Sequence, residues 1–220
     1  MKKIVLLLVL VLGIASLAFA ETLIYANTLP QGKWGIEGIY LTDSNVSNIS
    51  TISLNTYGVK VAYGFTDQLE LDLAYAMGNY AGMTGTEVSM SPLTAALRYN
   101  LLSEANDLPA TVTVAAGYKQ IPFKIKVGAA ETTQNWGKSG IALIASKMMI
   151  PFIPYIGLSY NTLSTPSVNV PSTELTIGTA IAWSKEGQVL VEYTSQSLTP
   201  DGGTNYTSPQ IGVGVLYSFL

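Results

Sequence analysis

Side chains of two kinds alternate along residues 210–219, close to the end of the chain. The odd positions are bulky and apolar, while the even positions are mostly small or polar. A period of two residues is the repeat of a β-strand, in which successive side chains point to opposite faces of the sheet. The segment is therefore predicted to be a strand with two unlike faces. Its bulky positions are Ile211, Val213, Val215, Tyr217 and Phe219.

The same alternation recurs between turn signals in nine further segments, so the sequence predicts ten strands. An even number returns both ends of the strand array to one side, as in bacterial single-chain barrels. Short connections alternate with longer ones, which predicts periplasmic turns and extracellular loops. The segment from Leu101 to Pro109 is longer than this scheme requires and is predicted to contain a helical turn around residues 103–105. The predicted strands are 32–42, 52–64, 69–77, 89–100, 110–120, 136–147, 152–161, 173–183, 187–195 and 208–219.

The first twenty residues have the pattern of an export signal. Lys2 and Lys3 precede an apolar run from Ile4 to Leu12, and Ala18-Phe19-Ala20 supplies the small-x-small site of a signal peptidase. Residues 1–20 are therefore predicted to be a cleavable signal peptide, the alternative being a retained anchor. Residues 21–220 are predicted to form one domain, because no linker-like stretch divides them.

Alternation alone fits a soluble barrel with an apolar lumen as well as a membrane barrel with an apolar exterior. Only 11% of the residues are charged, whereas soluble surfaces carry roughly a quarter or more. A water-facing surface of Gly and Ala would be poorly solvated, so that face suits a confined and partly water-filled lumen. The sequence therefore predicts an all-β fold: a single up-and-down antiparallel transmembrane β-barrel of about ten strands.

Aromatic residues gather near the ends of the predicted strands. Trp and Tyr prefer the two levels at which hydrocarbon meets lipid headgroups, although Tyr is also simply a good strand former. The predicted periplasmic girdle consists of Trp34, Tyr63, Tyr99, Trp183, Tyr217 and Phe219.

The chain resembles the small outer-membrane β-barrel proteins of diderm bacteria over about residues 30 to 220. The resemblance rests on Ala18-Phe19-Ala20, the alternating strands and the closing Tyr217-Ser218-Phe219-Leu220. In that family the last strand usually ends in an aromatic residue, which the barrel assembly machinery reads as a signal; here Leu220 follows Phe219. The resemblance implies a place in the outer membrane of a Gram-negative cell, with outer-membrane lipid and that machinery as partners.

Charged residues within the predicted strands fall almost entirely on the small-residue face. A charge at the bilayer midplane costs up to a few kcal/mol, so this placement keeps the charges inside the barrel. Lys60 and Asp72 are predicted to be cross-strand neighbours around the turn at 66–68, with Arg98 one strand further. Such a network either plugs the lumen as static polar filling or lines one wall of a water path. The lower layer is Glu37, Lys60, Glu70, Asp72, Arg98 and Glu192, and the upper layer is Lys119, Lys138 and Glu174.

The sequence offers two further candidate sites. Lys124 and Lys126 lie on one side of a segment that continues the alternation past the expected membrane edge. They either contact an anionic group such as a lipopolysaccharide phosphate or are simply solvated. A carboxylate pair such as Glu70 and Asp72 would suit acid–base catalysis only if one pKa were raised.

The chain contains no cysteine and no histidine. The first absence excludes disulfides, thiolate metal sites and cysteine nucleophiles. The second removes the usual proton shuttle and transition-metal ligand, on which omptin-type proteases and the lipid A acyltransferase and deacylase barrels depend. The mature chain is acidic, with no general attraction to nucleic acid. We therefore predict no enzymatic activity, no metal, no cofactor and no nucleic-acid partner.

The sequence thus predicts a non-enzymatic outer-membrane barrel. It would act as a narrow passive pore for small solutes or as a structural barrel with a polar, salt-bridged lumen. The alternative is a surface adhesin or ligand-binding barrel that acts through loops at 43–50, 78–88, 162–171 and 196–206.

Overall fold

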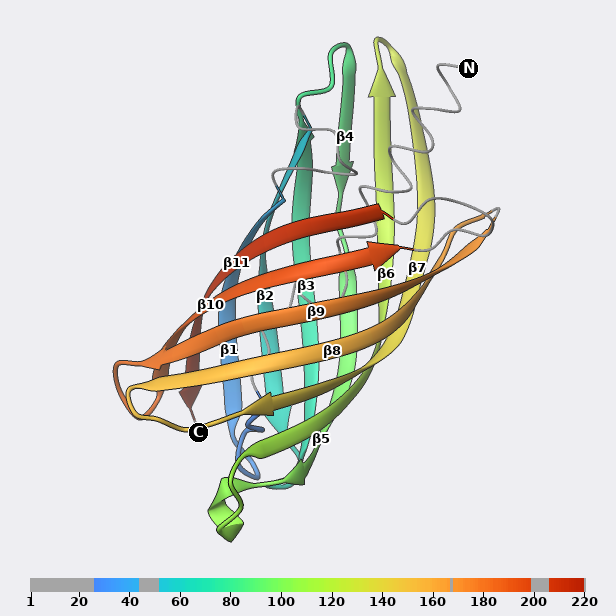
Figure 1. Cartoon of the computed structure of the whole chain (residues 1–220). Coiled ribbons are helices and arrows are strands. Elements are labelled where there is room, and N and C mark those ends of the chain that lie inside the picture. Colours follow the sequence, from blue (N-terminus) through green and yellow to red (C-terminus); the bar gives the residue numbers. More distant parts are fainter. Residues whose placement is uncertain (1–25, 44–51, 167, 199–205, 220) are drawn as a thin grey trace.

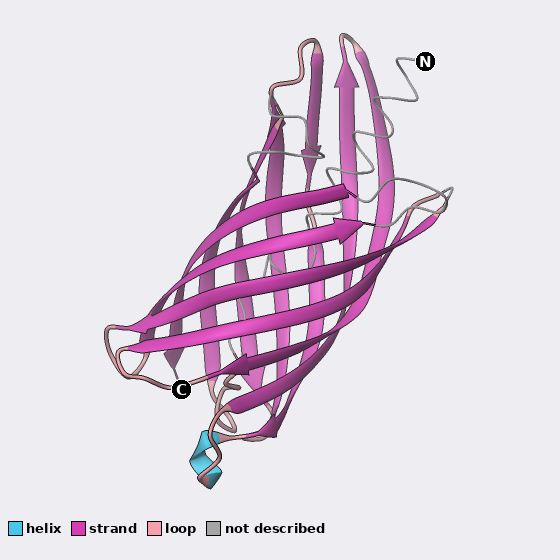
Figure 2. Ribbon diagram, viewed as in Figure 1, coloured by secondary structure: helices cyan, strands magenta, loops and turns pink. Residues whose placement is uncertain are grey.

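A computed structural model describes residues 26–43, 52–166, 168–198 and 206–219, and the predicted signal peptide lies outside these ranges. The described residues form one antiparallel sheet that curls into a barrel (Figures 1 and 2). No helix within them is long and apolar enough to cross a membrane. The strands are β1 (Trp34–Asp43), β2 (Ser53–Gly64), β3 (Leu69–Ala81), β4 (Thr86–Met90), β5 (Leu93–Leu102), β6 (Thr111–Val127), β7 (Ala130–Ser146), β8 (Phe152–Ser164), β9 (Asn169–Ala182), β10 (Gly187–Leu198) and β11 (Tyr206–Phe219).

The first and last strands close the barrel. β1 pairs with β11 along its whole length, from Trp34 opposite Phe219 to Asp43 opposite Gln210. β4 and β5 share the place between β3 and β6 and keep one register, being separated only by residues 91 and 92. β4 and β5 therefore form one interrupted strand, and the barrel wall has ten strand positions. The predicted fold, an antiparallel barrel of about ten strands, is confirmed.

Several strands are longer than predicted at the end of the barrel where the long connections lie, here called the loop end. β3 continues to Ala81, into the predicted loop at 78–88, and β6 and β7 pair as far as Val127 opposite Ala130, so that the predicted continuation of the strand past the membrane edge is one arm of a long hairpin. Gly128 makes its tight turn with a φ of 61°. Pairing satisfies the backbone polar groups of these residues.

The opposite end, the turn end, carries the connections at 66–68 and 184–186 and the C-terminal end of β11 (Figure 1). The predicted helical turn is confirmed: a 3-10 helix spans Glu104–Asn106, and the Ser103 hydroxyl accepts a hydrogen bond from the backbone N–H of Ala105. A hydrogen bond from Lys147, 2.5 Å from Glu104, lowers the pKa of the Glu104 carboxyl and ties two neighbouring turns together.

The outer surface over the middle of the barrel is apolar. Large outward side chains such as Leu73, Ile141, Ile156 and Leu175 are exposed to between 43% and 59%. The alternate residues along the same strands are buried or half-buried. This is the arrangement of a transmembrane barrel, in which lipid rather than water covers the exposed face.

The predicted periplasmic girdle lies at the turn end. Five of its members are exposed to between 43% and 53%, namely Trp34, Tyr99, Trp183, Tyr217 and Phe219. The sixth, Tyr63, is half-buried because its ring packs between Trp34 and Phe65, at centroid distances of 4.6 and 5.0 Å.

The polarity of the two faces reverses near the loop end. In the lower part of β6, Thr113 points inward and Val114 outward, but further along Phe123 points inward and Lys124 outward. Other strands show the same change, with Trp136 inside and Asn135 outside on β7. An apolar interior beneath a polar exterior is the pattern of a protein in water. The reversal therefore marks the level at which the barrel leaves the hydrocarbon.

At several described positions large side chains pack inside the lumen, where the sequence had suggested small residues with water-filled space beside them. Several inward glycines accommodate large side chains: a Cβ on Gly178 would lie 2.3 Å from the Tyr155 ring, and one on Gly78 would lie 2.3 Å from Met90. An apolar cluster fills the loop end of the lumen. It consists of Ile52, Leu54, Val88, Met90, Ile121, Phe123, Trp136, Leu163, Val170 and Leu198.

Candidate functional site in the lumen

All nine charged residues singled out in the lumen are buried, with at most 4% of each exposed: Glu37, Lys60, Glu70, Asp72, Arg98, Lys119, Lys138, Glu174 and Glu192. Their hydrogen bonds and ion pairs fall into three groups.

The first group lies at the turn end and spans β1, β2, β3 and β5. Glu37 and Lys60 are direct cross-strand partners, and their charged atoms lie 2.5 Å apart. Glu70 and Arg98 are partners in the same way, with Arg98 Nη1 donating to Glu70 Oε1 at 2.5 Å. Arg98 Nε also lies 4.0 Å from the Asp72 carboxylate. The turn-end group therefore combines three acids with two bases.

Lys60 and Asp72 lie on adjacent paired strands but are not direct register partners. Lys60 stands opposite Ala74, and Asp72 stands opposite Ala62, which places the two charged residues on a diagonal of the sheet. The register follows from the turn at 66–68, where the backbone N–H of Phe65 donates to the carbonyl of Leu69 at 2.8 Å. Lys60 consequently faces Glu37 on the other neighbouring strand.

A segment before the first strand enters the turn end of the lumen and contacts this group. The backbone N–H of Leu29 donates to Glu70 Oε2 at 2.5 Å, and Arg98 Nη2 donates to the carbonyl of Asn27 at 3.2 Å. Thr113 donates to the carbonyl of Ala26, which is fully buried. Residues 26–30, here called the N-terminal plug, are therefore held by side chains of β3, β5 and β6.

The wall is shaped to receive the N-terminal plug. A Cβ on Gly64 would lie 2.3 Å from the carbonyl oxygen of Pro30, so only glycine allows this approach. Outside the lumen, Asp67 accepts hydrogen bonds from Thr28 and Gln31 at 2.8 and 2.9 Å. The plug was not predicted, because residues 26–30 have neither alternation nor charge. The sequence offered one indication: Leu29 and Pro30 are apolar residues that lie outside every predicted strand.

The other two groups involve hydrogen bonds from uncharged side chains. Glu192 accepts hydrogen bonds from Tyr155 at 3.1 Å and from Thr194 at 3.2 Å. Nearer the loop end, Lys138 donates to Glu174 at 2.8 Å. Gln196 and Ser159 donate to the same carboxylate, at 2.7 and 3.1 Å. Lys119 stands opposite Lys138 on the neighbouring strand.

The space left at the turn end is very small. The cavity between the N-terminal plug and the turn-end group measures about 10 Å³ and is lined in part by Lys60, Glu70 and Arg98. A cavity of this volume holds about one water molecule. The charged groups and the plug thus fill this part of the barrel instead of lining a path through it.

Lys124 and Lys126 project from the long hairpin into solvent, and each has an acidic partner. Lys124 lies 2.9 Å from Glu131, and Lys126 lies 3.3 Å from Glu87. The predicted basic cluster is thus balanced by two carboxylates on adjacent strands. Among the described residues, no group of three or more acidic side chains is arranged to hold a metal ion.

Comparisons with known proteins describe the fold. No protein-family model and no curated protein matches the chain. Among solved structures, an outer membrane channel of Pseudomonas putida F1 is similar with a TM-score of 0.50 and 11% identity, over 88% of this chain and 98% of that one. The outer membrane protease OmpT of Escherichia coli (0.48, 10% identity, 86% and 94%) and the N-terminal barrel domain of OprF of Pseudomonas aeruginosa (0.42, 13%, 87% and 100%) are also similar. The chain has the architecture of an outer-membrane β-barrel, and at these identities the likeness concerns the fold alone.

Proposed function

We propose that this protein is a non-enzymatic outer-membrane barrel with a closed lumen, and that it acts as a structural barrel in contact with lipid. The turn end then faces the periplasm, and the long hairpin of β6 and β7 projects from the cell. The observation that carries the proposal is the filling of the turn end by the N-terminal plug and the ion pairs around Glu70 and Arg98.

The buried charges support a static role over a conducting one. A charge that lines a water path is hydrated, whereas Glu37, Lys60, Glu70 and Arg98 are almost completely shielded and pair at 2.5 Å. Such ion pairs partly offset the free-energy cost of burying charged side chains away from water. The apolar cluster around Phe123 and Trp136 adds a second barrier at the loop end.

The same contacts argue against catalysis. Glu70, the more exposed member of the acidic pair, already accepts hydrogen bonds from Arg98 and from the backbone of Leu29. Neither carboxylate of the pair has more than 2% of its surface exposed, so a substrate has no access to them. The chain also lacks histidine, the side chain that most often serves as a general base near neutral pH.

Single-channel recording in a planar bilayer tests the proposal. The refolded protein is expected to give no steady current steps, because the N-terminal plug and the turn-end group leave between them a cavity that holds about one water molecule. Folding of the barrel is verified separately by the shift in gel mobility on heating. Steady steps whose size changes when Lys60 or Arg98 is replaced would instead establish a pore.

The long hairpin favours a second candidate, a barrel that binds a partner at the cell surface. Residues 121–127 and 130–136 extend the barrel wall beyond the polarity reversal and present Lys124, Lys126 and Glu131 to solvent. Cells that express a barrel shortened by removal of residues 124–133 would then lose adhesion or partner binding while the barrel still folds.

A further inference from the structure

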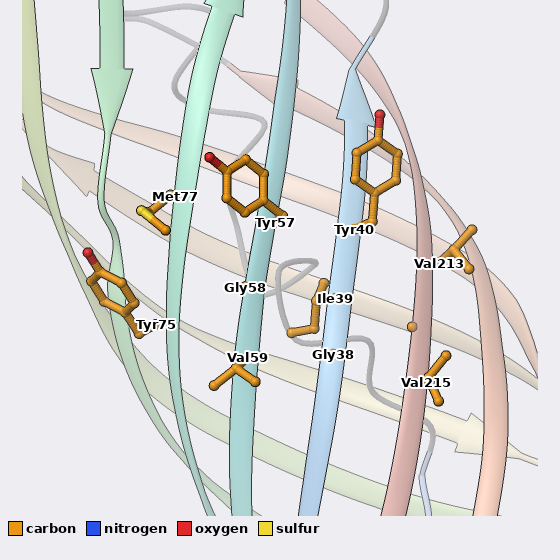
Figure 3. A pocket seen from close by; sticks show the side chains of 11 residues that line it. Gly38, Ile39, Tyr40, Tyr57, Gly58, Val59, Tyr75, Met77, Val213 and Val215 are labelled. Atoms are coloured by element: carbon orange, nitrogen blue, oxygen red, sulfur yellow. The ribbon is translucent and has the colours of Figure 1, made fainter.

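The lipid-facing surface contains a hollow of about 580 Å³ where β1, β2, β3 and β11 lie side by side (Figure 3). Gly38 lies at its centre, and Val59 and Val215 flank Gly38 in register on the neighbouring strands. Tyr57 and Tyr75 rise on one side, and Figure 3 shows their hydroxyl groups directed toward the loop end of the strands. We call this the apolar hollow.

Gly38 creates the depth of the apolar hollow. It takes an outward position on β1 that is otherwise bulky, between Ile36 and Tyr40. A Cβ placed on Gly38 would meet no atom within 4 Å, so the missing side chain leaves open space and relieves no clash. A convex barrel touches a lipid chain along one line, whereas a shallow hollow over Gly38 lets the chain contact the neighbouring valines and tyrosines as well. Its volume lies in the range of ligand pockets.

A second hollow of about 330 Å³ adjoins the first and shares Tyr57 and Met77 with it. It lies toward the loop end, because β3 runs from Met77 to Asn79 in that direction. Its lining combines polar and apolar residues: Asn79, Ser89, Ser91, Lys124 and Thr133 with Met90, Pro122 and Phe123. We call this the polar hollow.

The polar hollow lies at the level where the barrel leaves the hydrocarbon. The polarity reversal on β6 falls between Tyr118 and Lys124, and on β3 the outward residues change from Met77 to Asn79. Lipid headgroups occupy this level. The charge of Lys124 is balanced by Glu131 at 2.9 Å, so the hollow offers hydrogen-bonding groups with little net charge.

From these contiguous hollows we infer a binding site for one glycolipid. Its acyl chain lies over Gly38 between the valines and tyrosines, and its sugar headgroup occupies the polar hollow. Hydroxyl and amide side chains, together with Tyr57 at the junction, match the hydroxyl groups and apolar faces of a sugar better than they match a phosphate. The inference rests on the membrane location proposed above.

Native mass spectrometry of the folded barrel, released from a polyoxyethylene detergent, tests this site. The probes are a monoglucosyl diacylglycerol and a phosphatidylglycerol with the same acyl chains. One glycolipid is expected to remain bound, with a preference of about tenfold over the phospholipid, as one or two additional net hydrogen bonds would give. Equal retention of both lipids would overturn the headgroup assignment.

Two variants separate the parts of the site. Gly38→Leu fills the apolar hollow and is expected to abolish retention, whereas the control Ala116→Leu adds the same side chain to an outward position on β6 away from both hollows. The double variant Ser89→Ala, Ser91→Ala is expected to keep lipid binding and to lose the preference. Unchanged retention in Gly38→Leu would overturn the inference. A current in the bilayer recording would contradict the closed-lumen proposal without affecting this outcome.

Discussion

Replacing Arg98 with methionine is expected to lower the free energy of unfolding by about 3–5 kcal/mol, the usual cost of breaking a buried ion pair from one side. Methionine fills much of the same volume but leaves Glu70 and Asp72 without the guanidinium that lies 2.5 and 4.0 Å from them. It also removes the hydrogen bond to the carbonyl of Asn27, so the N-terminal plug loses one of its anchors. Urea titration of the barrel in lipid vesicles measures the change.

Lys124→Met provides the matched control for Arg98→Met. It removes a basic partner from an ion pair of similar length, Lys124 to Glu131 at 2.9 Å, but side chains there are 60% and 49% exposed. Water and salt screen such pairs, so the expected loss is below about 1 kcal/mol. The further replacement of Glu70 by methionine should recover part of the loss caused by Arg98→Met, because it removes one of the uncompensated carboxylates. Similar losses for Arg98→Met and Lys124→Met would show that the turn-end group is hydrated.

Residue alternation predicted the barrel because positions that face lipid favour bulky apolar side chains, whereas the next positions face the lumen and admit small or polar ones. Leu71 and Asp72 are adjacent in the chain, yet one is half-buried at the lipid face while the other is fully buried in the lumen. A continuous pattern of this kind fixes which face of each strand points outward. It does not fix where pairing stops: β7 begins at Ala130, six residues before the start predicted for that strand.

The interior was harder to predict than the wall. The apolar cluster around Phe123 and Trp136 follows from the polarity reversal, and a rule that assigns bulky residues to lipid along a whole strand places both on the wrong face. The N-terminal plug depends on long-range contacts such as that of Leu29 with Glu70, 41 residues apart in the chain. No local pattern encodes a contact between an irregular segment and a carboxylate on a distant strand.

A substitution at the middle of β8 tests most directly whether the outer face of the barrel contacts lipid. Ile156 is half exposed and stands in register with Ala145 and Ile177, between Phe152 and Tyr160 near the two ends of the apolar belt. In lipid, Ile156→Arg is expected to lower the free energy of unfolding by about 2–4 kcal/mol, the cost of arginine near the bilayer midplane. The measurement is again equilibrium unfolding from vesicles.

Val127→Arg is the matched control for Ile156→Arg, since Val127 has the same 50% exposure but lies at the tip of the long hairpin. In water an exposed valine can be replaced by arginine with a change within about 0.5 kcal/mol. The two substitutions therefore differ only in the solvent that surrounds the new charge. If arginine were tolerated equally well at both positions, water would surround the middle of the barrel, and neither a lipid-facing belt nor a glycolipid site over Gly38 could be maintained.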